Sequence, residues 1–280
     1  MTILVFGSNG QVASELKNFK DLIHLNQHEA NFLNPENVYS SIHKIKPLGV
    51  INPAAYTNVD LSEKHKNSAN TINGYAPKYI ALACKELNIP LIHLSTDYVF
   101  DGETSTEYFP EEKTNPINNY GRSKLMGEKF IIKSKCKFVI IRTSWVFSKH
   151  SSNFFKKILV KLKKNQDLEI VDDQYGCPTP ASKIAETCYL IINKLINGNK
   201  DYGVYHYAGK PNSNWFDFAT SILELTNSYS NIKPINSNEL NFVASRPKNS
   251  RLNCDLIKKN FDIDQPDWKN ELRKLVNELK

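Results

Sequence analysis

The strongest constraint on the fold lies at the start of the chain, where a short apolar run meets a glycine-rich turn. Residues Ile3-Leu-Val-Phe6 are followed by Gly7-Ser-Asn-Gly10-Gln-Val-Ala13, and a helix-like stretch continues from there. Glycines at such a strand-to-helix junction allow a tight turn and let backbone N–H groups approach a pyrophosphate. The pattern therefore favours dinucleotide binding. A kinase or ATPase is disfavoured, because its phosphate loop requires Gly-Lys-Ser/Thr.

Further apolar runs alternate with helix-like stretches through the first half of the chain. Strands are expected at residues 22–25, 50–51, 90–94 and 138–142, and a helix from Tyr120 to about Lys133 separates the last two. Short, continuously apolar strands that alternate with helices are typical of a parallel sheet covered on both faces. We therefore predict an α/β fold, a Rossmann-type doubly wound parallel sheet with a smaller C-terminal substrate-binding lobe.

The second half of the chain is organised differently. We expect residues 1–147 to form an NAD(P)-binding Rossmann domain. Residues 148–280 are expected to form mainly the substrate lobe, with some segments returning to the Rossmann sheet. A basic amphipathic helix is predicted at residues 154–164, a strand at 203–209, and a helix capped by Asn214 after that strand.

Composition narrows the functional classes. The chain has 280 residues, of which 40% are hydrophobic and 23% charged, an ordinary globular balance with enough apolar material for a core. No apolar run is long enough to span a membrane, and the N-terminus lacks a signal-peptide pattern. The five cysteines are widely spaced and odd in number, which fits a reducing cytosol. We expect a cytoplasmic protein.

The net charge of +7 suits an anionic partner. Nucleic acid, an anionic membrane and an anionic small substrate would each fit that charge. The basic residues of the 154–164 helix are not interleaved with aromatic residues, and no nucleic-acid-binding module is present. We therefore expect no nucleic-acid and no membrane partner.

A second motif follows the run at residues 90–94. Ser95-Thr96-Asp97-Tyr98 should lie at the carboxyl end of a parallel strand, where open α/β sheets bind ligands. Tyr120 and Lys124 are four residues apart and share one face of a helix. The tyrosine can exchange a proton with a substrate oxygen that Thr96 also contacts, and a nearby lysine ammonium and oxidised nicotinamide would lower its pKa. Together with the glycine turn, this favours catalysis by Tyr120, Lys124 and Thr96 over a core tyrosine beside a solvated lysine.

These motifs belong to an ordered series that covers nearly the whole chain. Its members are Gly7-x-x-Gly10-Gln11, NPAAYTNVD (52–60), STDYVFDG (95–102), YGRSKLMGE (120–128), RTSWVF (142–147), DQYGCPT (173–179) and RPKNSRLN (246–253). In this combination the chain resembles the dTDP-4-dehydrorhamnose reductase family, which are extended short-chain dehydrogenases/reductases. Single pieces are shared with other nucleotide-sugar epimerases and dehydratases.

The resemblance implies NADPH-dependent reduction of the C4 keto group of dTDP-4-dehydro-L-rhamnose to dTDP-L-rhamnose. Tyr120 would be the proton donor, Lys124 its partner on the nicotinamide ribose, and Thr96 a contact of the keto sugar. The cofactor contacts expected are Gly7, Gly10, Gln11, Val12, Asn31, Phe32, Ala55, Tyr56, Thr57, Tyr120 and Lys124. The substrate contacts expected are Thr96, Asp97, Tyr98, Trp145 and Arg246, the last as a guanidinium for the diphosphate.

Several properties stay open from sequence. The segment after the second strand offers neither an acidic ribose clamp nor an arginine for a 2′-phosphate, and Asn31 departs from the family pattern, so NADH is possible beside NADPH. Some family members form dimers bridged by Mg²⁺. Glu15 could join such a site, but the sequence itself specifies no metal site, and a homodimer is possible.

Two other functions fit the same motifs. One is reduction of another nucleotide-linked 4-keto-deoxysugar, for example a UDP-linked one. The other is a non-catalytic, NADP-binding regulatory subunit of the same fold. The intact set of Thr96, Tyr120 and Lys124 argues against the regulatory subunit, since a protein that only binds a cofactor needs no proton donor.

Overall fold

Six parallel strands form the central sheet, in the order β10-β5-β4-β3-β1-β2. The computed structural model describes residues 2–279. The strands are β1 (Ile3–Phe6), β2 (Leu22–Leu25), β3 (Gly49–Asn52), β4 (Leu91–Thr96), β5 (Phe138–Thr143) and β10 (Gly203–His206). The Rossmann-type sheet predicted from the alternating apolar runs is confirmed.

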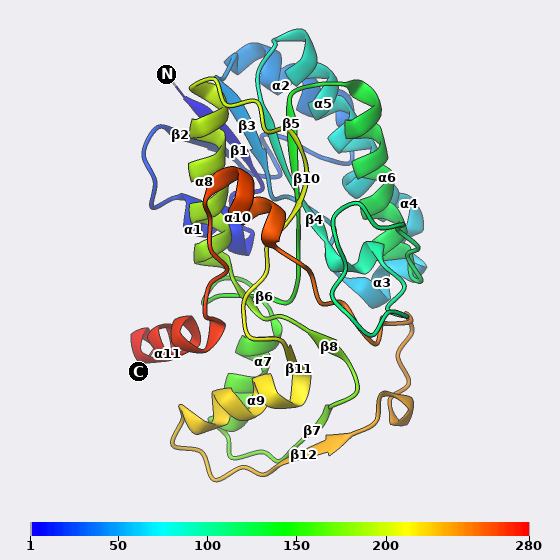
Figure 1. Ribbon diagram of the computed structural model, residues 1–280, viewed down its shortest axis with the longest axis vertical. Helices are drawn as coiled ribbons and strands as arrows, with labels where there is room; N and C mark the ends of the chain where they lie inside the picture. Colours follow the sequence, from blue (N-terminus) through cyan, green and yellow to red (C-terminus); the bar gives the residue numbers. More distant parts are fainter. Residues whose placement is uncertain (1, 280) are drawn as a thin grey trace.

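Helices cover both faces of this sheet (Figure 1). Ile3 and Val5 point to the face covered by two helices, while Leu4 and Phe6 point to the opposite face, since side chains alternate along a strand. The first face carries α1 (Gln11–Leu16) and α8 (Ala181–Ile196). The second carries α2 (Pro35–Ile45), α5 (Ala76–Glu86) and α6 (Asn119–Ser134).

The strand order reverses between β1 and β3, and ligands of open α/β sheets bind at such a point, beyond the carboxyl ends of the strands. The turn after β1 and the turn after β3 meet there. Gly7 has φ +73°, and a Cβ at this position would lie 2.8 Å from the Cβ of Ala54. A residue with a side chain fits neither the backbone conformation nor the space, so glycine is required where the two turns touch.

A second lobe occupies the lower part of Figure 1. It is formed by α7 (Phe154–Leu162), α9 (Trp215–Glu224), α11 (Trp268–Glu278) and the parallel pair β7 (Leu168–Val171) and β12 (Ile232–Ile235). Its core contains Phe155, Phe218 and Trp268, all fully buried. Between the strands of this lobe the chain returns to the sheet, where β10 pairs with β5 and α8 packs beside α1.

Shorter elements connect these parts. They are α3 (Val59–Lys64), α4 (Lys66–Asn70), the π-helical turn η1 (Thr71–Tyr75), η2 (Asp97–Val99), β6 (Val146–Phe147), β8 (Tyr175–Gly176), β9 (Thr179–Pro180), β11 (Ser213–Asn214), η3 (Ser237–Glu239) and α10 (Asp255–Phe261). Among residues 2–279 the helices are too short or too polar to cross a membrane.

Local predictions hold well in the helices. The predicted helix from Tyr120 to about Lys133 corresponds to α6, and the amide oxygen of Asn214 accepts the Asp217 N–H as the predicted cap of α9. The predicted basic helix at 154–164 corresponds to α7. The first helix is shorter than the stretch expected from the apolar pattern, since α1 ends at Leu16 and a turn follows.

Candidate active site

A cavity of about 880 Å³ opens at the carboxyl ends of β1, β3 and β4, and the second lobe closes its far side. Its size is in the range of small-molecule and cofactor sites. Fifteen of the residues predicted for the site line it: Gly7, Gly10, Gln11, Val12, Asn31, Phe32, Ala55, Tyr56, Thr57, Thr96, Asp97, Tyr98, Tyr120, Lys124 and Trp145. Arg246 does not line this cavity.

The turn after β1 has the features of a phosphate cradle. Within the described residues no side chain caps the start of α1, so the N–H groups of its first turn are not satisfied by a capping side chain. The backbone of Gly7 folds back so that its carbonyl accepts the Gly10 N–H at 2.9 Å. These features fit the pyrophosphate of a dinucleotide, whose oxygens accept backbone N–H groups.

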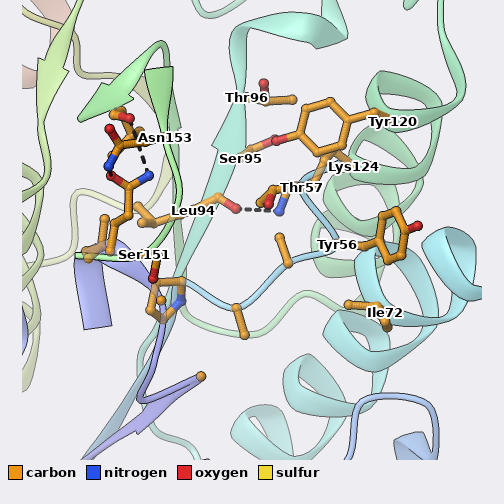
Figure 2. Close-up of a pocket in the computed structure, with 18 of the residues that line it drawn as sticks. Tyr56, Thr57, Ile72, Leu94, Ser95, Thr96, Tyr120, Lys124, Ser151 and Asn153 are labelled. Carbon is orange, nitrogen blue, oxygen red and sulfur yellow. Dashed lines mark hydrogen bonds between the residues drawn. The ribbon is translucent and has the colours of Figure 1, made fainter. Parts of the chain in front are cut away.

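The second lobe holds this turn through Gln11. The Oε1 atom of Gln11 accepts hydrogen bonds from the Ser148 hydroxyl and from Nδ2 of Asn153, both at 2.8 Å. The Ser151 hydroxyl donates to the carbonyl oxygen of Asn9, also at 2.8 Å. Figure 2 shows Ser151 and Asn153 on the wall opposite Tyr120. Sequence reasoning did not identify these contacts, because partners more than 130 residues apart leave no local pattern.

The wall after β3 is fixed by Asn73, which lies in the π-helical turn η1 and is fully buried. Its amide accepts the Tyr56 N–H at 2.7 Å and donates to the Tyr56 carbonyl at 3.0 Å. The same amide donates to the Ser123 hydroxyl on α6. Asn73 thus links the backbone beside the cofactor end of the cavity to the helix that carries Tyr120, and it was missed from sequence.

Tyr120 projects from α6 toward Thr96 and Ser95 at the end of β4 (Figure 2). Its ring meets the ring of Tyr98 edge to face, with centroids 5.9 Å apart. Burial raises the pKa of Tyr120 to about 12, against the effect of the Thr96 hydroxyl beside it. The lower pKa expected beside a lysine ammonium and an oxidised nicotinamide refers to the site with cofactor bound, whereas in the protein alone burial is the dominant effect. A tyrosine with a raised pKa keeps its proton at neutral pH and can act as an acid.

Lys124 is almost completely buried beneath the tyrosine. Its Nζ atom donates to the carbonyl oxygen of Leu94 at 2.6 Å, and it lies 3.3 Å from Nε2 of His93. Burial lowers the pKa of Lys124 to about 8, while the carboxylate of Glu128 one turn later raises it. Lys124 is therefore anchored on β4 and sits close to its point of deprotonation.

Asp97 lies next to the proposed reaction centre. Its Oδ1 atom accepts a hydrogen bond from the Thr96 hydroxyl at 2.9 Å, whereas Oδ2 is buried without a partner among the described residues. Burial raises the pKa of Asp97 to about 6, although the Thr96 and Ser250 hydroxyls act in the other direction. A buried carboxylate oxygen without a protein partner fits a site that accepts hydroxyl groups from a ligand.

Trp145 reaches the cavity from a strained backbone, with φ +46° in the left-handed region. Its indole stacks on that of Trp215 with ring centroids 3.7 Å apart and planes inclined by 10°. On Gly176, a Cβ would lie 2.5 Å from Cε2 of Trp145. Trp145 is thus clamped between Trp215 and the backbone of Gly176. Trp215 also lines the cavity, and sequence reasoning missed it.

Arg246 is held outside the cavity. Its Nη2 atom lies 2.7 Å from Oδ2 of Asp60, Nη1 donates to the Ala244 carbonyl, and the guanidinium stacks on the Phe242 ring at 3.8 Å. Its ion-pair partner Asp60 lies in the first turn of α3. Arg246 is thus not a lining residue of this cavity, although its charge acts on Tyr98, which does line it, and opposes the rise that burial causes in the Tyr98 pKa.

The described residues 2–279 contain no group of three or more His, Cys, Asp or Glu side chains placed to hold a metal ion. Glu15, considered for a Mg²⁺ site, instead lies 3.3 Å from the His150 imidazole.

Comparison with known proteins gives a consistent family. The family model described as RmlD substrate binding domain matches residues 1–280. The dTDP-4-dehydrorhamnose reductase of Sinorhizobium fredii is 36% identical over 286 residues, covering 99% of this chain and 97% of that protein. The enzyme of the same name from Shigella flexneri is 34% identical over 293 residues, covering 100% of this chain and 98% of that protein.

Solved structures agree with these relatives. A dTDP-4-dehydrorhamnose reductase from Clostridium acetobutylicum superposes with a TM-score of 0.93 at 33% identity, covering 100% of this chain and 99% of that one. The reductase from Bacillus anthracis, solved in complex with NADP, gives a TM-score of 0.92 at 31% identity and covers 99% of this chain and 100% of that one.

The raised pKa of Asp97 predicts a specific dependence of stability on pH. Between pH 4 and 6 the folded protein keeps a proton on Asp97 that the unfolded chain has released, so the contribution of Asp97 to the free energy of unfolding falls as pH rises through this window. We expect Asp97→Asn to remove about 2–3 kcal/mol of this fall. Urea unfolding of the wild type and of Asp97→Asn at several pH values between 4 and 6 measures this change in the free energy of unfolding. Asp217→Asn, at an exposed position, should leave the dependence unchanged, and an unaltered slope in Asp97→Asn would contradict the assignment.

Proposed function

The chain belongs to the dTDP-4-dehydrorhamnose reductase family, and we propose that Tyr120 is the proton donor of its reaction. The family's reaction is the NADPH-dependent reduction of the 4-keto group of dTDP-4-dehydrorhamnose, so the protein is an oxidoreductase of dTDP-rhamnose biosynthesis. The observation that supports Tyr120 most is its position: it faces Thr96 inside the cavity and retains its proton at neutral pH.

A reduced nicotinamide, when bound, would supply the hydride for C4 of the sugar. Residues of the chain would stabilise the negative charge that develops on the sugar oxygen. Tyr120 gives its proton to that oxygen, and the Thr96 hydroxyl orients it by a hydrogen bond. The Lys124 ammonium, which contacts His93 and the Leu94 carbonyl of β4, would place a positive charge near Tyr120. This charge favours the phenolate that remains after Tyr120 has given up its proton.

Each end of the cavity has its own proposed role. The turn of Gly7, Gly10, Gln11 and Val12 would hold the pyrophosphate, and Ala55, Tyr56 and Thr57 would line the nicotinamide half. Asn31 and Phe32 would contact the adenosine, since both line the cavity beside the end of β2. The second lobe, mainly residues 148–280, would cover the nucleotide sugar.

The substrate contacts we propose are Thr96, Asp97, Tyr98 and Trp145. Arg246 stays a prediction as a diphosphate ligand, because a diphosphate would compete with Asp60 for its guanidinium. A homodimer likewise stays a prediction. The five cysteines are all buried as free thiols, which supports a reducing compartment, and we propose the cytoplasm.

Replacing Tyr120 by phenylalanine tests the proton donor. We expect kcat for dTDP-4-dehydrorhamnose, followed by loss of NADPH absorbance, to fall about 10²–10⁴-fold because the alkoxide loses its acid. Affinity for NADPH, measured by fluorescence, should stay nearly unchanged. Tyr39→Phe, which removes a tyrosine hydroxyl on α2 outside the cavity, is the control. A wild-type kcat in Tyr120→Phe would exclude this role, and turnover of only UDP-linked keto sugars by the wild type would favour the alternative substrate.

Cofactor preference can be predicted from the adenosine end of the cavity. Among the lining residues in the described part of the chain, Lys124 and Asp97 are the only charged ones, and both belong to the reaction end. The described lining residues around Asn31 include neither a cation for a 2′-phosphate nor a carboxylate for a 2′-hydroxyl. We expect kcat/KM for NADPH and NADH to agree within about tenfold, a difference of about 1.4 kcal/mol.

A matched pair of variants sharpens that comparison. Asn31→Arg should shift the ratio toward NADPH, and Asn31→Asp toward NADH, because arginine accommodates the 2′-phosphate and a carboxylate binds the ribose hydroxyl. A ratio that moves in the same direction in both variants would mean that Asn31 does not contact the adenosine ribose.

Gly176→Ala tests the clamp on Trp145. The new Cβ would overlap the indole, and we expect KM for the sugar nucleotide to rise about tenfold while KM for the cofactor is unchanged, since a small-to-large change costs about 1–3 kcal/mol. The double variant Gly176→Ala/Trp145→Ala should be no worse than Trp145→Ala alone. Additive losses would show that Gly176 acts through some other contact.

A further inference from the structure

A buried histidine that the reaction above does not use lies directly behind Lys124. His93 is on β4, three residues before Thr96, and it is completely buried together with Asn52 on β3. Its Nε2 atom lies 3.3 Å from Nζ of Lys124, and its Nδ1 atom lies 3.0 Å from Nδ2 of Asn52. The three side chains form a line from the sheet interior to the reaction end of the cavity.

The protons along this line can be assigned from the backbone. The Ala54 N–H donates to Oδ1 of Asn52 at 3.2 Å, which fixes the orientation of the Asn52 amide. Nδ2 of Asn52 is therefore the donor toward His93, and Nδ1 of His93 is the acceptor. Burial and the nearby Lys124 lower the pKa of His93 well below its ordinary value, so the imidazole is neutral. Its single N–H is then on Nε2 and faces Lys124.

This assignment matters for the charge of Lys124. An ammonium group has only N–H donors, and one of them already reaches the Leu94 carbonyl. A second N–H directed at Nε2–H of His93 would bring two donors together. A neutral amine, by contrast, has a lone pair that can accept a hydrogen bond from Nε2–H of His93. The contact therefore favours loss of the third proton of Lys124.

Other charged or titratable groups surround Lys124 and act on the same proton. From α6, Glu128 favours the ammonium, but its carboxylate is itself paired with Arg142 of β5 at 2.8 Å. Tyr120 also lies on α6, and Asp97 follows β4 in η2. His93 is the one neighbour in the described structure within hydrogen-bond reach of Nζ that offers a donor instead of an acceptor.

We propose that His93, oriented by Asn52, is a positioning residue whose Nε2–H group favours transfer of the third proton of Lys124 to the Tyr120 phenolate. The inference rests on the proposed role of Tyr120. After Tyr120 has given its proton to the sugar oxygen, Lys124 gives a proton to the phenolate, and the resulting amine accepts the hydrogen bond from His93. A proton from bulk solvent, relayed by water in the cavity, then protonates the Lys124 amine, so that one proton is taken up from solvent per turnover and the charges balance.

Two substitutions separate the two halves of the imidazole. In His93→Asn the side-chain oxygen can occupy the place of Nδ1 and still accept from Asn52, but nothing reaches Lys124. In His93→Gln the longer amide can accept from Asn52 through oxygen and donate to Lys124 through nitrogen. His93→Gln is thus the conservative variant, and His93→Asn removes only the contact with Lys124.

The first measurement is the titration of Lys124 in the cofactor-free protein, by NMR of lysine labelled with ¹³C at Cε and assigned with Lys124→Met. We expect the pKa of Lys124 to rise by about one unit in His93→Asn, a tenfold change in acid dissociation, and to stay close to the wild-type value in His93→Gln. The basic limb of the kcat–pH profile should move by the same amount in His93→Asn, with KM for both substrates unchanged. Thermal melting and NADPH binding verify that each variant is folded.

The outcomes distinguish this inference from the function on which it rests. Equal titration of Lys124 in the wild type and in a folded His93→Asn variant would overturn the role of His93, whatever the enzyme reduces. The same shift of the Lys124 pKa in His93→Asn and in His93→Gln would also overturn the role of His93, because the shift would then come from loss of the imidazole ring and not from loss of the hydrogen bond to Lys124. A shifted titration in a protein whose Tyr120→Phe variant keeps full activity would instead overturn the proposed role of Tyr120.

Discussion

The contact between the turn after β1 and the turn after β3 is the constraint on which the site depends. Gly7 and Ala54 approach so closely that a side chain on Gly7 would collide with Ala54. This contact places the uncapped start of α1 beside the backbone of residues 54–57, and both lie at the point where the strand order reverses. The cavity, the phosphate cradle and the position of β4 relative to them all follow from it.

A layer of buried polar groups supports the reaction end of the cavity. Glu128 and Arg142 form an ion pair with almost no exposure, and the Ser95 hydroxyl donates to the same carboxylate. Such a pair is costly to desolvate and contributes little net stability compared with apolar packing. The contribution of the pair is structural specificity, because a fully satisfied buried hydrogen-bond network holds its members in one geometry. Here the network fixes the end of β4 against α6, and therefore Thr96 against Tyr120.

The sequence was sufficient for those parts of the site that depend on local pattern. The apolar runs predicted the parallel sheet, Gly7 and Gly10 predicted a tight turn between the first strand and the first helix, and the spacing of Tyr120 and Lys124 placed both side chains on one helical face. Contacts between distant segments left no such pattern. Trp145 stacks on Trp215, and Arg246 pairs with Asp60 across 186 positions, and neither partner could be read from the sequence. The rise that burial causes in the pKa of Tyr120 in the protein alone was not predicted either, because burial cannot be read from a four-residue spacing.

The groups at the reaction end share one electrostatic tendency. Burial raises the pKa values of Asp97 and Tyr120 and lowers that of Lys124, so each group is pushed toward its neutral form. A site with few fixed charges and little water has a low effective dielectric constant, and a single proton transfer then changes the local field strongly. The negative charge that develops on a sugar oxygen would consequently interact with Tyr120 and Lys124 more strongly than it could in water. The same burial that makes these residues unfavourable for stability would therefore favour the proton transfer proposed for Tyr120 and Lys124.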